Sequence, residues 1–276
     1  MNKKKFVIIG NPIAHSLSPI LHNYWFKKYK ISAEYSLLKI KEDEIKNVIS
    51  KIKNKTIHGV NVTLPYKQKV IAHLDQHIND AKESGSVNTI YLNEDKKVIG
   101  ENTDIYGLQA AYFKKIIDNN SIKKKALIIG AGGVSPSIIV ALTKSNVVDI
   151  TIINRTYDKC LFLKNKFKDL KILKWEELND SVKDFDIIIN ATSLGLKNGK
   201  DFETLFKDYK KSLIYIDTIY NPIQTKMIKH LQSFEIRTFN GLEMFIYQGQ
   251  KSFYLWNKIN PEIDQELINL LVTKLK

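Results

Sequence analysis

The chain has 276 residues, a formal net charge of +14 and one cysteine, Cys160. This length suits two modest domains or one large α/β domain, and a single cysteine excludes an internal disulfide and is typical of a reducing cytoplasm. No apolar run is long enough to cross a bilayer, and the apolar run near the N-terminus is too short for a secretory signal. We therefore expect a cytoplasmic protein with no membrane partner.

The excess of positive charge consists almost entirely of lysine. Of the 43 basic residues only Arg155 and Arg237 are arginine, and the lysines are spread along the whole chain. A nucleic-acid-binding protein usually gathers its basic residues on one face or in a recognised module. We therefore interpret the lysines as a solvated surface and expect no nucleic-acid partner. The positive field would nevertheless attract anionic substrates and phosphorylated cofactors.

The first hundred residues alternate between strand and helix patterns. Ser18 followed by Pro19 predicts a helix start, with the serine as N-cap and the proline at the first helical position. Glu94 and Asp95 form an exposed turn between two apolar runs and predict a hairpin. The expected elements are strands at 5–10, 33–40, 58–63, 86–93 and 97–102 and helices at 18–29, 42–53 and 67–74.

From Thr103 onward the pattern changes to longer strand–helix units, which predicts a parallel, doubly wound sheet. Structured segments near 103 and 240 join the two halves, so a cleft between two domains is the natural ligand site. The expected elements are helices at 105–118, from 134, at 157–167 and throughout 241–274, and strands at 125–130, 147–154, 171–173, 186–190, 212–217 and 236–240.

A glycine-rich turn, Gly130-Ala131-Gly132-Gly133, follows an apolar strand and precedes a helix. Dinucleotide-binding folds carry their glycine fingerprint in this context, because the first glycine permits a tight turn and the next lets backbone amides approach the pyrophosphate. Ser135 replaces the third glycine with another small residue. The alternative is a plain strand–turn–helix connection without a ligand.

About one strand–helix unit later, the next strand ends in Asn154-Arg155-Thr156. In an NAD-binding fold this position usually carries an acid that binds the ribose hydroxyl. An arginine between an amide and a hydroxyl suits a 2′-phosphate instead. The pattern therefore favours NADP over NAD and indicates a redox enzyme.

Other polar residues have two interpretations each. Ser16 and Ser18 follow a strand and could form a hydroxyl clamp for a carboxylate, aided by the helix N-terminus, or could be one cap and one bystander. Lys67 follows a strand end and a proline, but lysine is also the commonest surface residue of this chain. Asp104 could simply cap the helix that follows it.

The sequence offers no metal site and no familiar nucleophile motif. His73 and His77 are four residues apart, but no Asp, Glu or Cys completes a plausible ligand set. Cys160 lies in a helix pattern without a base signature, and we interpret it as a helix residue. The chain contains neither a Walker A sequence nor a Gly-x-Ser-x-Gly elbow.

Taken together, and in this order over nearly the full length, the motifs resemble the shikimate dehydrogenase family. They are HSLSP (15–19), NVTLPYK (61–67), VNT (87–89), NTD (102–104), GAGG (130–133), NRT (154–156), NATSLG (190–195) and GLEMFIYQGQ (241–250). The resemblance implies an α/β fold with a substrate domain at 1–103, a Rossmann-type NADP domain at 104–240, and C-terminal helices at 241–276 that complete the substrate domain. It also implies the reversible NADPH-dependent reduction of 3-dehydroshikimate to shikimate, in aromatic amino-acid biosynthesis.

The resemblance also implies roles for individual residues. Lys67 and Asp104 match the family's catalytic pair, and the chain departs from the family's usual alanines at Gly249-Gln250 and at Val134-Ser135-Pro136. Matching substrate-binding positions are Ser16, Ser18, Thr63, Lys67, Asn88, Asp104, Tyr220 and Gln248. Matching cofactor-binding positions are Gly130, Ala131, Gly132, Gly133, Val134, Asn154, Arg155, Thr156, Thr192, Ser193 and Gly241.

The expected chemistry agrees with these residue types. Hydride reduction of a ketone leaves a developing alkoxide, which needs a proton and a nearby positive charge. The Lys67 ammonium can supply both, and the Asp104 carboxylate can orient it. We expect a small-molecule substrate, NADP(H) as cofactor, no metal, and a monomer or homodimer.

Three alternatives remain open at this point. A quinate/shikimate dehydrogenase would use NAD more readily or accept quinate, and Arg155 argues against an NAD preference. A non-catalytic Rossmann regulatory protein would not need the Lys67–Asp104 pair. A basic nucleic-acid-binding protein would need arginine clusters that this chain lacks.

Overall fold

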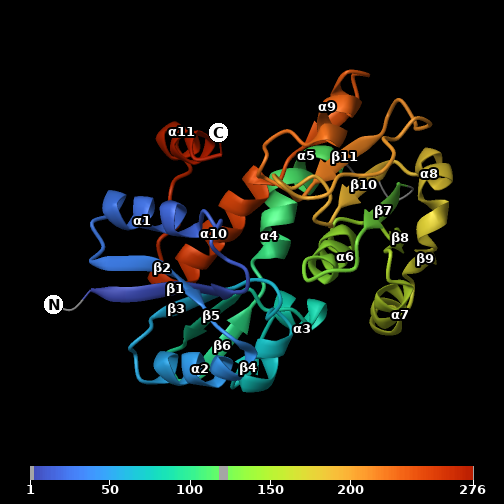
Figure 1. Cartoon of the computed structure of the whole chain (residues 1–276). Coiled ribbons are helices and arrows are strands. Elements are labelled where there is room, and N and C mark those ends of the chain that lie inside the picture. The colour runs from blue at the N-terminus through green and yellow to red at the C-terminus, as the bar shows by residue number, and fades with distance from the viewer. Residues whose placement is uncertain (1–2, 118–123, 276) are drawn as a thin grey trace. The chain divides into compact units, whose positions relative to one another are not determined.

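The computed structural model describes residues 3–117 and 124–275. The chain divides into two compact units (Figure 1). Unit 1 holds the residues up to Gly107 and the segment Ile246–Lys274, and unit 2 holds Leu108–Phe245. The chain therefore leaves unit 1 after its N-terminal half, builds unit 2, and returns to unit 1 near its C-terminal end.

Unit 1 contains a six-stranded mixed sheet in the order β2-β1-β3-β5-β6-β4. Strands β2 and β3 lie parallel to β1, whereas β5 is antiparallel to both β3 and β6, and β4 pairs parallel with β6. The expected hairpin is confirmed as β5–β6, with its turn at the exposed Glu94 and Asp95. The strands are β1 (Lys4–Gly10), β2 (Ala33–Lys39), β3 (Gly59–Val62), β4 (Gln76–His77), β5 (Thr89–Leu92) and β6 (Val98–Glu101).

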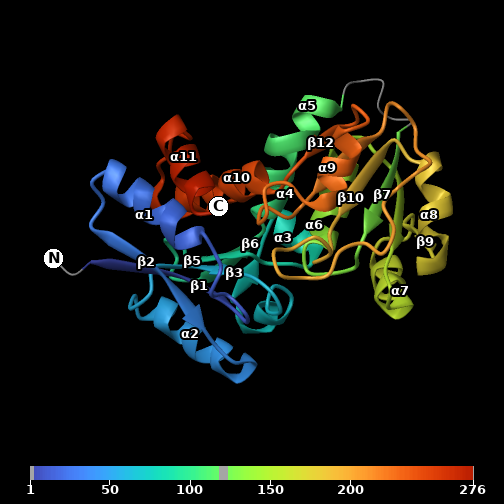
Figure 2. The same cartoon turned by 45° about the horizontal axis from the view of Figure 1, so that its top comes forward.

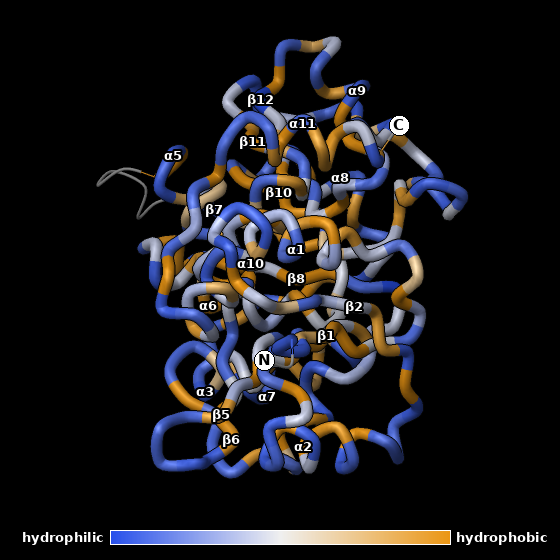
Figure 3. The backbone as a smooth tube through the Cα atoms, turned by 90° about the vertical axis from the view of Figure 1, so that its left-hand side faces the viewer, coloured by the Kyte–Doolittle hydropathy of each residue, from blue (hydrophilic) through white to orange (hydrophobic). Residues whose placement is uncertain are grey.

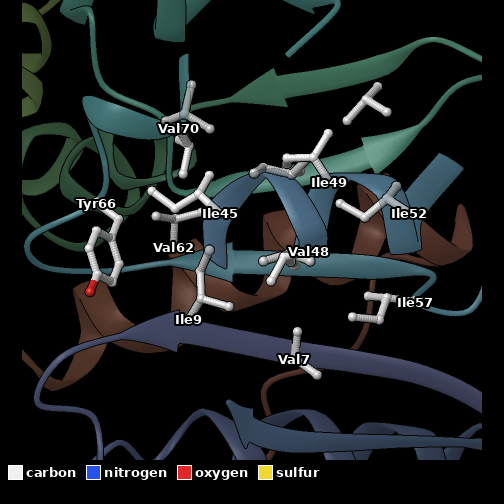
Figure 4. Packing of buried hydrophobic residues seen from close by; sticks show 14 of the residues in the cluster. Val7, Ile9, Ile45, Val48, Ile49, Ile52, Ile57, Val62, Tyr66 and Val70 are labelled. Atoms are coloured by element: carbon white, nitrogen blue, oxygen red, sulfur yellow. The ribbon is translucent and has the colours of Figure 1, made fainter. Parts of the chain in front are cut away.

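The amphipathic helix expected at 42–53 forms as η1 (Glu42–Glu44) followed by α2 (Ile45–Lys53). Its apolar side chains recur at helical spacing, so one face packs on the sheet. Ile45, Val48 and Ile49 pack in the buried core together with Ile9 of β1 and Val62 of β3 (Figure 4). The other helices of unit 1 are α1 (Ser18–Lys28), η2 (Lys69–His73), α3 (Asp80–Ser84) and α11 (Gln265–Thr273). Helix α4 (Asp104–Leu108) continues from unit 1 into unit 2, and α10 (Leu242–Asn257) begins in unit 2 and continues into unit 1.

The C-terminal helices complete the core of unit 1, as the fold prediction expected. Trp256 of α10 donates its Nε1–H to the carbonyl of Ile90 at 3.2 Å. A Cβ at Gly59 of β3 would lie only 2.5 Å from Trp256 Nε1, so the absent side chain lets the indole reach the strand. Phe253, one turn earlier, packs edge-on against Trp25 of α1 with ring centroids 5.5 Å apart.

Unit 2 contains a six-stranded, fully parallel sheet in the order β12-β11-β10-β7-β8-β9 (Figures 1 and 2). Counted along this unit the order is 6-5-4-1-2-3, which is the doubly wound dinucleotide-binding arrangement. Its four inner strands are largely buried apolar runs, as parallel sheets require, whereas the edge strands β9 and β12 are exposed or half-buried. The inner strands β8 and β10 are largely orange in Figure 3. They are β7 (Lys125–Ile129), β8 (Asp149–Ile153), β9 (Lys171–Leu173), β10 (Ile187–Asn190), β11 (Ile214–Asp217) and β12 (Arg237–Phe239).

The predicted fold class is therefore confirmed. The helices of unit 2 are short, and all but the first two lie between its strands. They are η3 (Gln109–Phe113), α5 (Lys114–Ile116), α6 (Ser135–Lys144), α7 (Tyr157–Lys166), η5 (Trp175–Glu177), α8 (Leu178–Ser181), η6 (Val182–Asp184) and α9 (Lys226–Gln232). No helix within the described ranges is long and apolar enough to cross a membrane.

Several local predictions were wrong. Ser18 is the first residue of α1 rather than its N-cap; Leu17 holds the cap position. The helix expected at 67–74 is a 3-10 helix at 69–73, and β4 was not predicted. The helix expected at 105–118 contains a π-helical stretch at 109–113 and ends at Ile116, and position 118 lies outside the described residues.

Candidate active site

The sheet of unit 1 gathers distant segments at one edge. Strands β1, β3 and β6 run in the same direction, and the antiparallel β5 begins at the level where β3 and β6 end. The residues that follow β1, β3 and β6 therefore lie close to the residues that precede β5. The amide of Thr63 donates to the carbonyl of Ile9 at 2.9 Å. Asn88 links two neighbours, because its carbonyl accepts from Val62 N at 2.8 Å and its amide donates to Glu101 O at 3.0 Å.

Lys67 and Asp104, which are 37 positions apart in sequence, form an ion pair at this edge. Lys67 Nζ lies 2.6 Å from Asp104 Oδ2, and the two side chains are only 12% and 6% exposed. The second carboxylate oxygen, Oδ1, accepts from Asn88 Nδ2 at 2.8 Å. A poorly solvated ion pair needs such additional hydrogen bonds to offset its desolvation.

The side chain of Asn88 is oriented by the backbone. Its Oδ1 accepts from the amide of Thr103 at 2.7 Å, so Nδ2 points toward Asp104. Gln248 of α10 reaches the same group, with Oε1 3.4 Å from Asn88 Nδ2. The structure thus brings four of the predicted site residues, Lys67, Asn88, Asp104 and Gln248, into one connected cluster.

The two serines expected to form a clamp lie between β1 and the first turn of α1. Ser16 Oγ donates to Ser18 Oγ at 3.1 Å and accepts from the amide of Ser18 at 3.3 Å. Ser18 is buried, whereas Ser16 is half-buried. Their hydroxyls therefore lie side by side, as a clamp for a carboxylate requires.

The glycine turn of unit 2 needs glycine at its first position. Gly130 has φ +111°, and a Cβ there would lie 2.9 Å from both the carbonyl carbon and the oxygen of Ala191. Ser135 stabilises the turn, because its hydroxyl donates to Gly130 O at 2.8 Å and accepts from Gly132 N at 3.0 Å. Above Gly132 the space is open, with the nearest atom to a Cβ at 3.8 Å. A pyrophosphate could therefore approach the backbone closely here.

The Asn154-Arg155-Thr156 segment follows β8, directly beside the glycine turn. Asn154 Oδ1 accepts from Ala131 N at 3.2 Å, and its Nδ2 donates to Thr156 O at 2.9 Å, so this amide holds the turn in shape. Arg155 and Thr156 are exposed at the start of α7. Lys159, one turn further, is exposed as well; its spacing of four from Arg155 is a signal that the sequence analysis missed.

The segment after β10 borders the glycine turn, since a Cβ on Gly130 would lie 2.8 Å from Thr192 Cγ2. Thr192 Oγ1 donates to Asn190 Oδ1 at 2.7 Å and accepts from Leu194 N at 3.0 Å, whereas Ser193 is exposed. Gly241 donates its amide to Ile219 O at 2.8 Å, and any Cβ there would overlap the carbonyl of Thr218.

Of the remaining predicted positions, Gly133 and Val134 complete the turn that precedes α6, and Thr63 follows β3. Tyr220 belongs to unit 2, where its ring packs against Phe245 with centroids 4.9 Å apart. Among the described residues no group of three or more His, Cys, Asp and Glu side chains could hold a metal ion.

Two buried titratable groups were not singled out from the sequence. Asp217, at the end of β11, accepts from Asn190 Nδ2 at 3.1 Å and Thr225 Oγ1 at 2.9 Å, and burial raises its pKa to about 6. His22 of α1 stacks on Tyr35 at 4.4 Å, and burial lowers its pKa to about 3. Neither has a local sequence signal, because burial arises from the surrounding core.

Two family models match this chain. The model described as "Shikimate dehydrogenase substrate binding domain" matches residues 8–90, and the one described as "Shikimate / quinate 5-dehydrogenase" matches residues 112–244. The shikimate dehydrogenase (NADP(+)) of Pelagibacter ubique (strain HTCC1062) is 48% identical over 269 residues, which cover 98% of this chain and 99% of that protein.

Solved structures show the same likeness. A shikimate dehydrogenase crystallised in complex with NADP+ superposes with a TM-score of 0.88 at 33% identity, covering 99% of this chain and 96% of that one. Shikimate 5-dehydrogenase from Thermus thermophilus, in complex with NADP(H) and shikimate, gives a TM-score of 0.85 at 25% identity and covers 99% and 100% of the two chains. The similarity therefore extends over both units.

Proposed function

The chain belongs to the shikimate dehydrogenase family, and we propose that it catalyses the reversible NADP(H)-dependent interconversion of 3-dehydroshikimate and shikimate. The observation that carries this proposal is the poorly exposed Lys67–Asp104 pair, bonded through Asn88 to the Gln248 side chain. A lysine at the surface for solubility alone would not be enclosed in this way. The cluster provides a cation, a carboxylate and amide groups at the edge of one sheet.

Lys67 is the residue that handles the proton. In the reducing direction its ammonium stabilises negative charge on the substrate oxygen and donates a proton to it; in the oxidising direction the neutral amine accepts the proton from the hydroxyl. Asp104 Oδ2 fixes the position of Lys67 Nζ, and Asn88 holds the other carboxylate oxygen. NADP(H), when bound, supplies or accepts the hydride.

The substrate is held through its carboxylate and its ring hydroxyls. Ser16 and Ser18 present adjacent hydroxyls to the carboxylate, and the motif match alone assigns Tyr220 a role in binding the same carboxylate. Thr63, Asn88 and Gln248 bind the ring hydroxyls. These roles are supported by the motif matches and by the position of the unit 1 residues at one sheet edge.

The cofactor is held by unit 2. Residues 130–134 offer the backbone to the pyrophosphate, and Arg155 and Thr156 bind the 2′-phosphate, with Lys159 as an additional cation. Asn154 contributes to cofactor binding by holding the glycine turn in place through its hydrogen bonds to Ala131 and Thr156. Thr192, Ser193 and Gly241 line the nicotinamide end. We accordingly assign unit 2, Leu108–Phe245, to cofactor binding, and unit 1, up to Gly107 with Ile246–Lys274, to substrate binding; these bounds lie a few residues beyond the expected ones at 103/104 and 240/241.

The proposal is tested by an assay that crosses two substrates with two reductants. We expect purified protein to oxidise NADPH rapidly with 3-dehydroshikimate, and far more slowly when NADH or 3-dehydroquinate replaces either component. Equal rates with 3-dehydroquinate or with NADH would favour a quinate/shikimate dehydrogenase. No oxidation in any combination would favour a non-catalytic binding protein.

Two further features of the proposal concern the state of the protein in the cell. We propose a cytoplasmic enzyme, supported by its single cysteine, which is buried in α7. We also propose that it works as a monomer or homodimer, which sedimentation of the purified chain would decide.

A further inference from the structure

Beneath the site of unit 1 lies a group of three buried hydroxyls, here called the hydroxyl cluster: Thr89, Thr103 and Ser252. None is more than 1% exposed. Thr89 Oγ1 lies 2.7 Å from Ser252 Oγ and 3.2 Å from Thr103 Oγ1, and Thr103 Oγ1 lies 3.1 Å from Ser252 Oγ. The three come from β5, from the segment after β6, and from α10.

The amide of Asn61 extends this cluster to β3. Its Nδ2 lies 3.0 Å from Ser252 Oγ and 3.1 Å from Thr89 Oγ1. The orientation of the amide is fixed from the other side, because its Oδ1 accepts from the hydroxyl of Tyr35 at 2.7 Å. Asn61 therefore presents donors, not an acceptor, to the cluster.

Ser252 Oγ joins groups from three segments. Asn61 Nδ2 of β3 donates to it at 3.0 Å, and the hydroxyls of Thr89 and Thr103 lie 2.7 and 3.1 Å away. Thr103 Oγ1 in turn accepts from Asn88 Nδ2 at 2.9 Å and can donate to Asn88 Oδ1 at 3.1 Å, so Thr103 links Ser252 to Asn88. The Ser252 hydroxyl also reaches the carbonyl of Gln248, 3.0 Å away on the preceding turn of α10.

We propose that Ser252 is a positioning residue for the substrate. Its hydroxyl ties the turn of α10 that carries Gln248 to the chain segments that carry Asn88 and Asp104, so that the amides face the substrate in a fixed arrangement. This inference rests on the proposed function. Without the hydroxyl, Asn61 Nδ2 and the hydroxyls of Thr89 and Thr103 lose a hydrogen-bond partner, and the Gln248 turn loses its attachment to the sheet edge.

Ser252→Ala tests this proposal through separate Michaelis constants. In initial-rate measurements of NADP+ reduction we expect the KM for shikimate to rise about tenfold, the equivalent of one lost buried hydrogen bond. We expect the KM for NADP+ to stay within about twofold of the wild-type value, since the cluster belongs to unit 1. A purely structural loss would lower the amount of active enzyme and leave both KM values unchanged.

Ser84→Ala is the matched control. Ser84 is 1% exposed, donates to the carbonyl four residues before it, Asp80, at 2.7 Å, and accepts from the side-chain Nδ2 of Asn102 at 3.0 Å. Its hydroxyl contacts neither Asn88 nor Gln248 among the described residues. We expect it to lose stability like Ser252→Ala but to keep the wild-type KM for shikimate.

Two further variants keep the test decisive. Ser252→Thr retains the hydroxyl and should restore the KM for shikimate, whereas Ser252→Cys retains the size with a much weaker hydrogen-bonding group and should resemble Ser252→Ala. A wild-type KM in the alanine and cysteine variants, or an equal rise in Ser84→Ala, would overturn the positioning role. An inactive wild-type protein would instead overturn the proposed function itself.

Discussion

The two units build their ligand-facing edges in opposite ways. In unit 1 the edge consists of side chains that bond one another, with Lys67, Asn88 and Asp104 poorly exposed and connected. In unit 2 the edge consists of backbone, with a glycine that no other residue could replace at φ +111° and an exposed Arg155. Proton transfer needs charged groups that are held in fixed positions and shielded from water. A phosphate, by contrast, can be bound by backbone amides and a solvent-exposed cation. Under the proposed function, this difference assigns proton transfer to unit 1 and the choice of reductant to unit 2.

Each unit also buries a titratable group whose pKa is displaced, downward for His22 of unit 1 and upward for Asp217 of unit 2. Unit 1 encloses the neutral ring of His22, and both of its nitrogens lack a hydrogen-bond partner among the described residues. Unit 2 encloses the carboxyl group of Asp217. A fall in pH therefore lowers the free energy of unfolding through protonation of His22, whereas a rise in pH lowers it through ionisation of Asp217.

The largest expected effect concerns the chemistry of unit 1. Lys67→Ala should lower turnover about a hundredfold to ten-thousandfold, because a general acid–base group is removed, and should leave NADP binding nearly unchanged. Steady-state rates and cofactor titration measure both. Lys69→Ala is the control, since this neighbouring lysine is 44% exposed and pairs with Glu42 at the surface. Wild-type-like turnover in Lys67→Ala would remove Lys67 from the mechanism.

The next prediction concerns His22. Burial lowers its pKa from 6.5 to about 3, so its stabilising contribution is complete above pH 6.5 and is lost as the pH falls toward 3. The full loss is about 5 kcal/mol of the free energy of unfolding. His22→Phe should therefore flatten the acid branch of urea unfolding between pH 6.5 and 4. The exposed His15→Ala serves as control and should follow the wild type; an unchanged slope in His22→Phe would contradict the prediction.

A smaller effect of opposite sign is expected for Asp217. Its pKa is raised from 3.8 to about 6, so its contribution to the free energy of unfolding is complete below pH 3.8 and is lost as the pH rises through 6. The full loss is about 3 kcal/mol of the free energy of unfolding. Asp217→Asn keeps an acceptor for Ile219 N and should show less loss of stability than wild type between pH 4 and 6. If the two unfolding curves stayed parallel over this range, the carboxyl group would not be the cause.

The smallest effect concerns the cofactor. Arg155→Ala should raise the KM for NADPH by about tenfold, the value of a charge-assisted contact with a phosphate, and should change the KM for NADH much less. Arg237→Ala is the matched control, because it removes the other arginine, which is exposed on β12 and lies over the ring of Phe239. Equal losses with both cofactors would refute a phosphate-binding role for Arg155.

Sequence patterns predicted the elements best where they depend on local chemistry. The apolar strands, the hairpin at Glu94 and Asp95, and the glycine turn follow from periodicity and from backbone freedom. The wrong predictions concern residues whose structure depends on contacts with other segments. Ser18 lies within the helix, and its backbone amide donates to Ser16 Oγ. The two-residue β4 forms a strand through its pairing with β6.

The sequence by itself determined the types of groups in the site and their order along the chain. Motifs indicated Lys67, Asp104 and Arg155, because residue types and their spacing can be read directly from the sequence. Only the tertiary structure decided that Lys67 and Asp104 meet, that Asn61 and Ser252 support Asn88 and Gln248, and that His22 and Asp217 have displaced pKa values. The reason is physical: hydrogen-bond partners and loss of solvent come from segments that only folding brings together.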